Sequence, residues 1–211
     1  MKVGVIGCGT MGSGIAQVAS TANCDVVVYD LSADALAKSK LALAKVMARL
    51  IEKGRVTEQQ SQAIQDRITY SSELNLMQGA DFVIEAIVEN LEIKHKVFTA
   101  LEAIVSEDCI IASNTSSLSI TSLAACLQKP ERFVGVHFFN PAPLMKLVEI
   151  IPAVQTEATI LDQAKATIDS WGKTTVTVKD TPGFIVNKVA RPFYSEAIKM
   201  LEEGTADFAT I

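Results

Sequence analysis

The first thirty residues constrain the fold of this chain more than any other stretch. An apolar run over Lys2–Ile6 leads directly into a glycine-rich turn. A helical pattern follows over 13–22, and a second apolar run over 25–29 ends at Asp30. Strand, turn, helix and strand in this order form one βαβ unit. The sequence therefore predicts an α/β protein built on a mostly parallel sheet.

The turn reads Gly7-Cys8-Gly9-Thr10-Met11-Gly12 and has the G-x-G-x-x-G spacing. Gly7 would permit the tight turn, Gly9 would let the backbone approach a pyrophosphate, and Gly12 would let the helix pack closely on its strand. The backbone N–H groups of the helix N-terminus would then face the phosphates. These glycines, with Thr10 and Met11, are the predicted dinucleotide-binding turn.

Asp30 lies about 20 residues after this turn, where the dinucleotide fingerprint has an acidic residue. Its carboxylate would accept hydrogen bonds from the adenine ribose hydroxyls, and its charge would repel a 2′-phosphate. The next basic residue is Lys38. We therefore expect NAD, and not NADP, as the cofactor.

The rest of the chain continues the alternation of strands and helices. Strands are expected at 68–70, 81–86, 109–112 and, at a sheet edge, 174–178. Helices are expected at 33–53, 57–65, 91–105 and 157–171. Another helix should run to Leu127, with Ser116 or Ser117 as a possible N-cap, and a last one should run from 184 to 203 with a break at Pro192. The helices at 33–53 and 57–65 form a helical hairpin inserted into a doubly wound, Rossmann-like sheet.

Two strand-like runs, 133–139 and 145–151, are separated by a turn too short for a crossover helix, so they should pair as an antiparallel hairpin. His137 and Glu149 lie on opposite arms. In a register whose paired numbers sum to an even number, both side chains face the same side, whereas an odd register separates them. A histidine backed by a carboxylate is typical of a general base, although a buried histidine with a satisfied hydrogen bond is the commoner arrangement.

A stripe of basic residues and one single lysine have unusual positions. Lys38, Lys45, Arg49 and Lys53 form a basic stripe on the helix at 33–53, which is either a solvated face or a docking surface for an anionic substrate. Lys94 shares the apolar face of its helix and should extend past the sheet. It would either reach water at the helix end or meet a cofactor hydroxyl or phosphate, with Glu89 as its neighbour.

Composition excludes several other classes of function. The net charge of −5 gives no electrostatic footprint for nucleic acid or an anionic membrane. No apolar run reaches the roughly 18 residues of a spanning helix. The four cysteines lack C-x-x-C spacing and should be reduced thiols, so neither a metal site nor disulfides are expected. The expected location is the cytoplasm, or an organelle matrix after processing.

Five motifs give the chain a resemblance to the L-3-hydroxyacyl-CoA dehydrogenases, which include the 3-hydroxybutyryl-CoA enzymes. They are the runs 5–12 (VIGCGTMG), 85–90 (EAIVEN), 113–117 (SNTSS), 137–141 (HFFNP) and 180–187 (DTPGFIVN), and the resemblance extends over nearly all 211 residues. The run 189–197 resembles the phenylacetate-pathway branch, whose substrate is a hydroxyadipyl-CoA.

The resemblance implies NAD-dependent oxidation of a 3-hydroxyacyl-CoA, or the reverse reduction. It makes His137 the catalytic base and Glu149 its orienting carboxylate, and it places Ser116 and Asn187 on the reacting oxygen. By the same resemblance, Glu89, Lys94 and Asn114 would join the glycine turn and Asp30 in binding the cofactor. The helical hairpin would grip CoA through Lys53 and Arg55, although Val46 stands where the family has a serine.

The resemblance also implies two domains, an NAD-binding domain over 1–182 and, over 183–211, the first helix of an all-helical domain that completes the substrate cleft and a homodimer. We would expect a chain with only that first helix to bind NADH, to turn over poorly and to self-associate. Two alternatives remain at this point. One is a non-catalytic dinucleotide-binding relative, and the other is a β-hydroxyacid dehydrogenase, which would use a lysine base.

Overall fold

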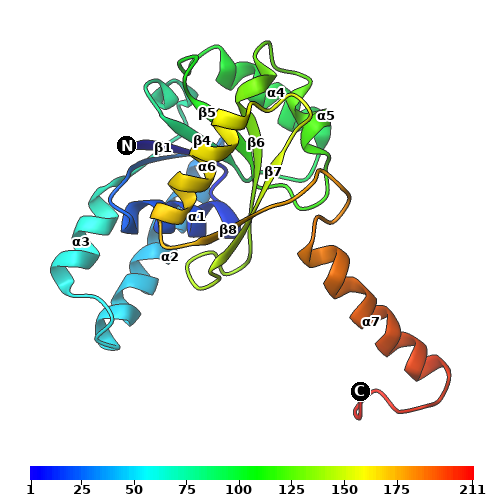
Figure 1. The fold of residues 1–211 in the computed structure, drawn as a ribbon. Coiled ribbons are helices and arrows are strands. Elements are labelled where there is room, and N and C mark those ends of the chain that lie inside the picture. Colours follow the sequence, from blue (N-terminus) through cyan, green and yellow to red (C-terminus); the bar gives the residue numbers. More distant parts are fainter.

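The computed structural model describes residues 1–211 and contains one eight-stranded sheet (Figure 1). The strand order is β3-β2-β1-β4-β5-β6-β7-β8, and every neighbouring pair is parallel except β6 and β7. The strands are β1 (Lys2–Ile6), β2 (Asp25–Tyr29), β3 (Ile68–Ser71), β4 (Phe82–Glu85), β5 (Ile110–Ser113), β6 (Phe133–Phe138), β7 (Leu147–Pro152) and β8 (Thr174–Thr177). The expected mostly parallel sheet with one antiparallel hairpin is confirmed.

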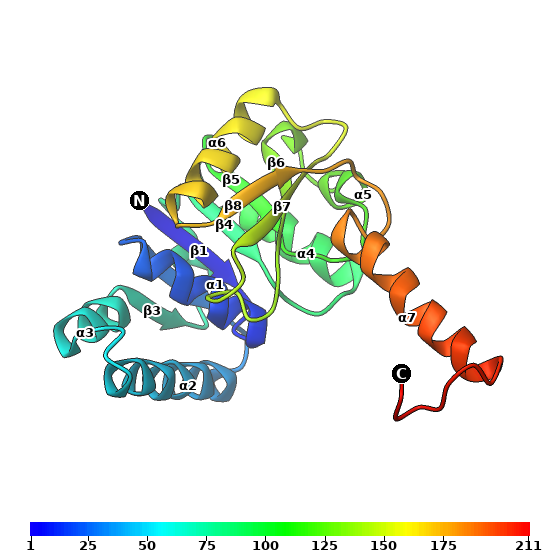
Figure 2. The ribbon, with the colours of Figure 1, turned by 60° about the horizontal axis from the view of Figure 1, so that its bottom comes forward.

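Helices cover both faces of the sheet (Figures 1 and 2). One face packs against α1 (Thr10–Thr21), α2 (Ala33–Glu52), α3 (Glu58–Asp66) and α6 (Ala158–Ser170). The other packs against α4 (Leu91–Glu102), α5 (Ile120–Ala124) and the short 3₁₀ helix η1 (Leu74–Met77). Because the central strands β4 and β6 are buried at every position, their sequences do not alternate between apolar and polar residues, and only Glu85 and His137 interrupt the apolar runs.

The order in which the chain adds strands to the sheet changes direction between β1 and β4. From β1 it proceeds to β2 and β3 on one side, and it then crosses to β4, β5 and β6 on the other. Ligands bind outside the carboxyl ends of the strands at such a switch point. The glycine turn after β1, Asp30 after β2, Glu89 after β4 and the 113–117 loop after β5 all lie at this edge.

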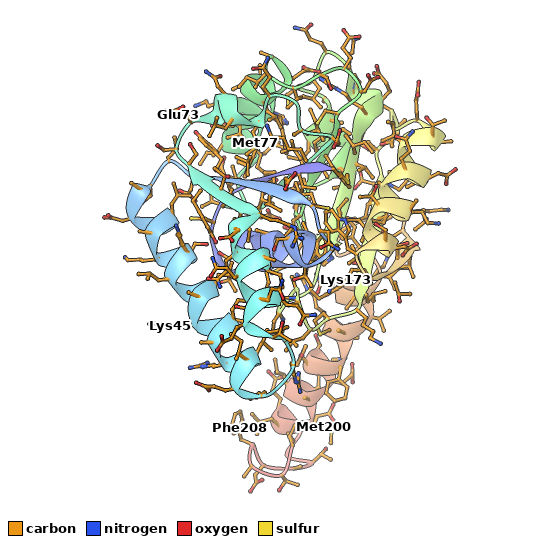
Figure 3. All side chains as sticks on the ribbon, turned by 90° about the vertical axis from the view of Figure 1, so that its left-hand side faces the viewer. Lys45, Glu73, Met77, Lys173, Met200 and Phe208 are labelled. Atoms are coloured by element: carbon orange, nitrogen blue, oxygen red, sulfur yellow. The ribbon has the colours of Figure 1, made fainter.

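The last helix, α7 (Val186–Glu202), projects away from the sheet, and none of its residues is buried (Figures 1 and 2). Met200 and Phe208 lie at the end of the molecule opposite Glu73 and Met77 (Figure 3). No helix is both long and apolar enough to cross a membrane.

Three local predictions were wrong. Helix α5 begins at Ile120 with Ser119 as its N-cap, not at Ser116 or Ser117. Helix α7 continues through Pro192 without a break. The carbonyl that this proline leaves without a donor belongs to exposed Lys188, where water can bond to it. The strand β7 begins at Leu147, two residues later than expected. In addition, the 3₁₀ helices η1 and η2 (Pro130–Arg132) had no clear sequence signal.

Candidate active site

The glycine turn has the geometry that its spacing predicts. Gly7 has φ +98°, and a Cβ added there would lie 2.6 Å from the carbonyl oxygen of Ala86. A Cβ at Gly12 would overlap the carbonyl oxygen of Gly7. Gly9 differs from both, because a Cβ there would meet nothing within 4 Å. Gly7 and Gly12 are therefore required by the protein's own packing, whereas Gly9 borders open space at the N-terminus of α1, where a phosphate group would be held.

Asp30 is fixed beside this turn. Its Oδ2 accepts hydrogen bonds from the backbone N–H of Cys8 (3.0 Å) and from the Cys8 thiol (3.2 Å), and its Oδ1 accepts from the Ser32 N–H (3.0 Å). Burial raises the pKa of Asp30, but these hydrogen bonds outweigh it and hold the pKa below 3.8. The carboxylate is thus charged at neutral pH, as recognition of a ribose diol requires.

Lys94 is held by two carboxylates. The side chain is 1% exposed, and its Nζ lies 2.5 Å from Oε1 of buried Glu85 and 3.2 Å from Oε2 of Glu89. The prediction that Lys94 extends past the sheet was therefore wrong, although Glu89 is the expected neighbour. An ammonium buried on an apolar helix face needs an opposite charge, and Glu85 at the end of β4 supplies it.

Glu85 and Glu89 also hold the loop that follows β5. Glu85 Oε2 accepts from the Ser113 hydroxyl (2.6 Å). Glu89 Oε1 accepts from the hydroxyls of Thr115 and Ser117 and from the backbone N–H of Ser116. Burial raises the pKa of Glu89, but these hydrogen bonds and the Lys94 charge bring it below 4.5. The loop that carries Ser116 is thereby fixed to the connection between β4 and α4.

Asn114 joins this loop to the neighbouring strand. Its Oδ1 accepts a hydrogen bond of 2.8 Å from the Phe138 N–H at the end of β6. The predicted cofactor residue Asn114 thus lies beside the predicted catalytic strand, with its amide group free to donate.

His137 and Glu149 are paired directly across β6 and β7, in the even register. The His137 Nδ1 lies 2.7 Å from Glu149 Oε2, and both residues are buried, Glu149 fully. A charged Glu149 can only accept, so in a neutral imidazole paired with it Nδ1 carries the proton and Nε2 keeps its lone pair. Two aromatic rings lie near the His137 ring, with centroids 4.5 Å away at Phe139 and 5.6 Å away at Phe184.

The second oxygen of Glu149 anchors α7. Its Oε1 accepts from the backbone N–H groups of Ile185 and Val186, both at 2.9 Å. These donors belong to the start of the helix, where unpaired N–H groups and the helix dipole favour an anion. Asn187 follows in the first turn, so one carboxylate fixes both His137 and the backbone that carries Asn187.

A hollow of about 510 Å³ connects these parts at the carboxyl edge of the sheet, within the size range of small-molecule sites. Seven of the predicted site residues line it, namely Met11, Glu89, Lys94, Asn114, Ser116, His137 and Asn187. Glu149 lies behind His137. The fingerprint glycines and Asp30 lie at the β1–β2 side of the same edge.

Lys53 and Arg55 are not brought to this hollow, because they lie at the far end of α2. The basic stripe on α2 is exposed and forms no ion pair. Two residues near the hollow had no role assigned from the sequence. An acid at the end of the apolar run 82–84 could have identified Glu85. Arg191 lies in the run 189–197 that resembles the phenylacetate-pathway branch, but that resemblance assigned no role to its side chain.

Comparison with known proteins matches this arrangement to one family. The family model described as 3-hydroxyacyl-CoA dehydrogenase, NAD binding domain, matches residues 2–181, and the C-terminal domain of that enzyme matches residues 183–211. The crystal structure of (S)-3-hydroxybutyryl-CoA dehydrogenase from Ralstonia eutropha superimposes with a TM-score of 0.96 at 42% identity, over 100% of this chain and 74% of that one.

Two curated relatives have similar identity. The 3-hydroxyadipyl-CoA dehydrogenase of Escherichia coli is 44% identical over 97% of this chain, which spans 43% of the length of that relative. The 3-hydroxybutyryl-CoA dehydrogenase of Bradyrhizobium diazoefficiens is 43% identical over 100% of this chain, which spans 72% of that relative. With this identity, the Rossmann-like sheet and the matched NAD-binding domain, the chain belongs to the 3-hydroxyacyl-CoA dehydrogenase family.

Proposed function

We propose that the protein interconverts (S)-3-hydroxyacyl-CoA and 3-oxoacyl-CoA with NAD as its cofactor. The observation that carries this proposal is the His137–Glu149 pair, which borders the same hollow as Ser116 and Asn187. Oxidation of a secondary alcohol requires of the protein a base with its orienting carboxylate, and polar side chains that line the same hollow as the base.

The chain's own residues fit the cofactor. The open space at Gly9 would accommodate the pyrophosphate, and the Asp30 carboxylate would accept from the adenine ribose. Met11, Glu89 and Asn114 would lie along the nicotinamide half, with Lys94 neutralising Glu89. NAD, when bound, supplies the acceptor for the hydride from C3 of the substrate.

His137 handles the proton. Because its Nδ1–H donates to Glu149, its Nε2 can accept the proton of the 3-hydroxyl as hydride leaves C3. The negative charge of Glu149 then stabilises the imidazolium. In the reverse direction, the same Nε2 returns the proton to the 3-oxo group.

Ser116 and Asn187 position the reacting oxygen. Both residues line the hollow, Ser116 from the loop fixed by Glu89 and Asn187 from α7. CoA would extend from the hollow toward α2, where Lys53 and Arg55 offer positive charge to its phosphates, as phosphate recognition requires.

We also infer that the protein self-associates and works in the cytoplasm. Exposed apolar side chains along α7 support the first inference. Four unpaired cysteine thiols support the second, because they suit a reducing compartment. Cell fractionation of the tagged protein tests the location.

The decisive experiment is NADH formation from (S)-3-hydroxybutyryl-CoA and (S)-3-hydroxyadipyl-CoA by the complete protein. We expect NADH with at least one substrate, and a loss of about 10²–10⁴-fold in kcat in His137→Gln with NADH affinity retained. A protein that binds NADH and oxidises neither substrate is instead a non-catalytic relative. Full activity in His137→Gln would remove His137 as the base.

A further inference from the structure

Arg191 borders the proposed reaction hollow from α7. It lies one helical turn after Asn187, so the two side chains share a face of the helix, about 6 Å apart along its axis. The Cα–Cβ bond of a helical residue tilts toward the helix N-terminus, which here directs Arg191 toward Asn187 and His137. Arg191 lines both this hollow and an adjoining one of about 390 Å³.

The guanidinium of Arg191 has no carboxylate partner. It takes part in none of the ion pairs of the structure, and the acids around it have other partners. Glu196, which lines the adjoining hollow, pairs with Lys199 at 2.6 Å. Glu89 pairs with Lys94, and Glu149 holds His137. An unpaired guanidinium beside a substrate hollow is a ready receptor for an anion.

We propose that Arg191 selects acyl-CoA substrates whose acyl chain ends in a carboxylate. This inference rests on the proposed function, because it places C3 of the substrate between His137 and Asn187. The acyl chain beyond C3 then passes along α7, and one turn further a terminal carboxylate meets Arg191.

The phosphates of CoA do not compete for this residue. The proposed CoA-binding residues lie at the end of α2, whereas α7 projects from the opposite side of the molecule (Figures 1 and 2). A fork of N–H donors recognises a planar carboxylate in a bidentate manner, which a lysine at this position would not reproduce.

The test compares substrates of equal length, (S)-3-hydroxyadipyl-CoA and (S)-3-hydroxyhexanoyl-CoA, on the complete protein. We expect the ratio of their kcat/KM values to favour the carboxylate substrate and to fall roughly tenfold to a hundredfold in Arg191→Met, the range of a charge-assisted hydrogen bond. Arg191→Lys should recover part of the ratio. Lys188→Met removes a neighbouring cation that lines only the adjoining hollow, and it should leave the ratio near its original value.

A binding measurement separates this proposal from the proposed function. Calorimetry in the presence of NADH compares adipyl-CoA with hexanoyl-CoA, which lack the 3-hydroxyl and need no turnover. A preference for adipyl-CoA that disappears in Arg191→Met supports the role of Arg191 even if no turnover occurs. Equal affinities in the unmutated protein, or equal losses for both ligands in Arg191→Met, overturn it.

Discussion

At the residue scale, the Glu149 carboxylate has two tasks that can be separated by mutation. One oxygen orients His137 and the other accepts two backbone N–H groups of α7. Gln at this position keeps one acceptor but turns an amide N–H₂ toward donors. We therefore expect Glu149→Gln to lower kcat and also to destabilise the protein by about 1–3 kcal/mol.

His137→Gln is the matched control, because it leaves the bonds to α7 intact. Urea unfolding and kcat, measured for both variants, separate the orientation of His137 from the anchoring of α7. Equal unfolding free energies for Glu149→Gln and His137→Gln would show that the bonds to α7 contribute nothing to stability.

Two glycines of the fingerprint should respond to alanine in opposite ways. Gly9 has φ −65° and ψ −171° and open space around it, so Gly9→Ala should fold normally while its methyl group weakens NADH binding. Gly12→Ala forces a methyl group into the Gly7 carbonyl oxygen, and it should destabilise the fold by several kcal/mol, as overpacking of a rigid site does. Thermal unfolding and NADH titration of both variants check this. Normal NADH affinity in Gly9→Ala would place the pyrophosphate elsewhere.

At the element scale, the short helix α5 is capped from a distant part of the chain. Asp180 accepts hydrogen bonds from the Ser119 hydroxyl (2.8 Å) and from the N–H groups of Ile120 (3.0 Å) and Thr121 (2.9 Å). Burial raises its pKa, but the hydrogen bonds from Thr121, Ser119 and Ile120 outweigh it and hold the pKa below 3.8. The cap is therefore strongest when this carboxylate is charged.

A depressed pKa fixes the sign of the pH dependence. The stability that Asp180 contributes is complete above its unfolded pKa of about 3.9 and is lost as the pH falls through the lower folded value. At pH 7, Asp180→Ala should cost about 0.5–2 kcal/mol, as loss of a cap does. The difference from the unmutated chain should shrink at about pH 3. Urea unfolding at both pH values measures it, and a pH-independent difference would contradict a role for the charge.

Elements set by local patterns could be predicted from the sequence, and those set by distant partners could not. The sequence left the register of the β6–β7 pair open between an even and an odd sum, and only the structure shows the even one. The glycine turn and the pairing of these two strands follow from spacing and turn length within short segments. The start of α5 does not. Ser116 and Ser117 are residue types that cap helices, yet both donate hydrogen bonds to Glu89, which lies 27 and 28 residues earlier in the chain. The helix is capped instead by Asp180, which lies 61 residues after Ser119.

The position of Lys94 was missed for a different reason. Its partner Glu85 is only nine residues away, but the two belong to a strand and a helix whose packing decides that they meet. Periodicity placed Lys94 correctly on the apolar face of α4. It gave no indication that the end of β4 would present a buried carboxylate there.

At the scale of the whole molecule, α7 carries an exposed apolar surface. Val189, Phe193 and Ile198 are 71%, 76% and 59% exposed, and Ile185 and Leu201 are 48% and 44% exposed. Exposed patches of more than a few hundred Å² are rare in soluble monomers. We expect this 211-residue chain to self-associate through α7, as light scattering over a range of concentrations would detect.

A charged substitution tests which surface is responsible for the expected self-association. Val189→Glu should shift the chain toward the monomer, whereas Ser170→Glu, at an exposed position of α6, should not. A chain that is monomeric before any substitution, at every concentration, would show that α7 needs no partner.

The two hydrogen bonds from α7 to Glu149 have a kinetic consequence. Any swing of α7 that widens access to the hollow must break both bonds to the carboxylate that also holds His137. If His137 is the base, as proposed, it is oriented only while α7 is docked, and we expect loading of substrate and transfer of the proton to take place in different conformations. Amide hydrogen exchange at Ile185 and Val186 reports on this gating, and it should slow when a substrate analogue closes the site.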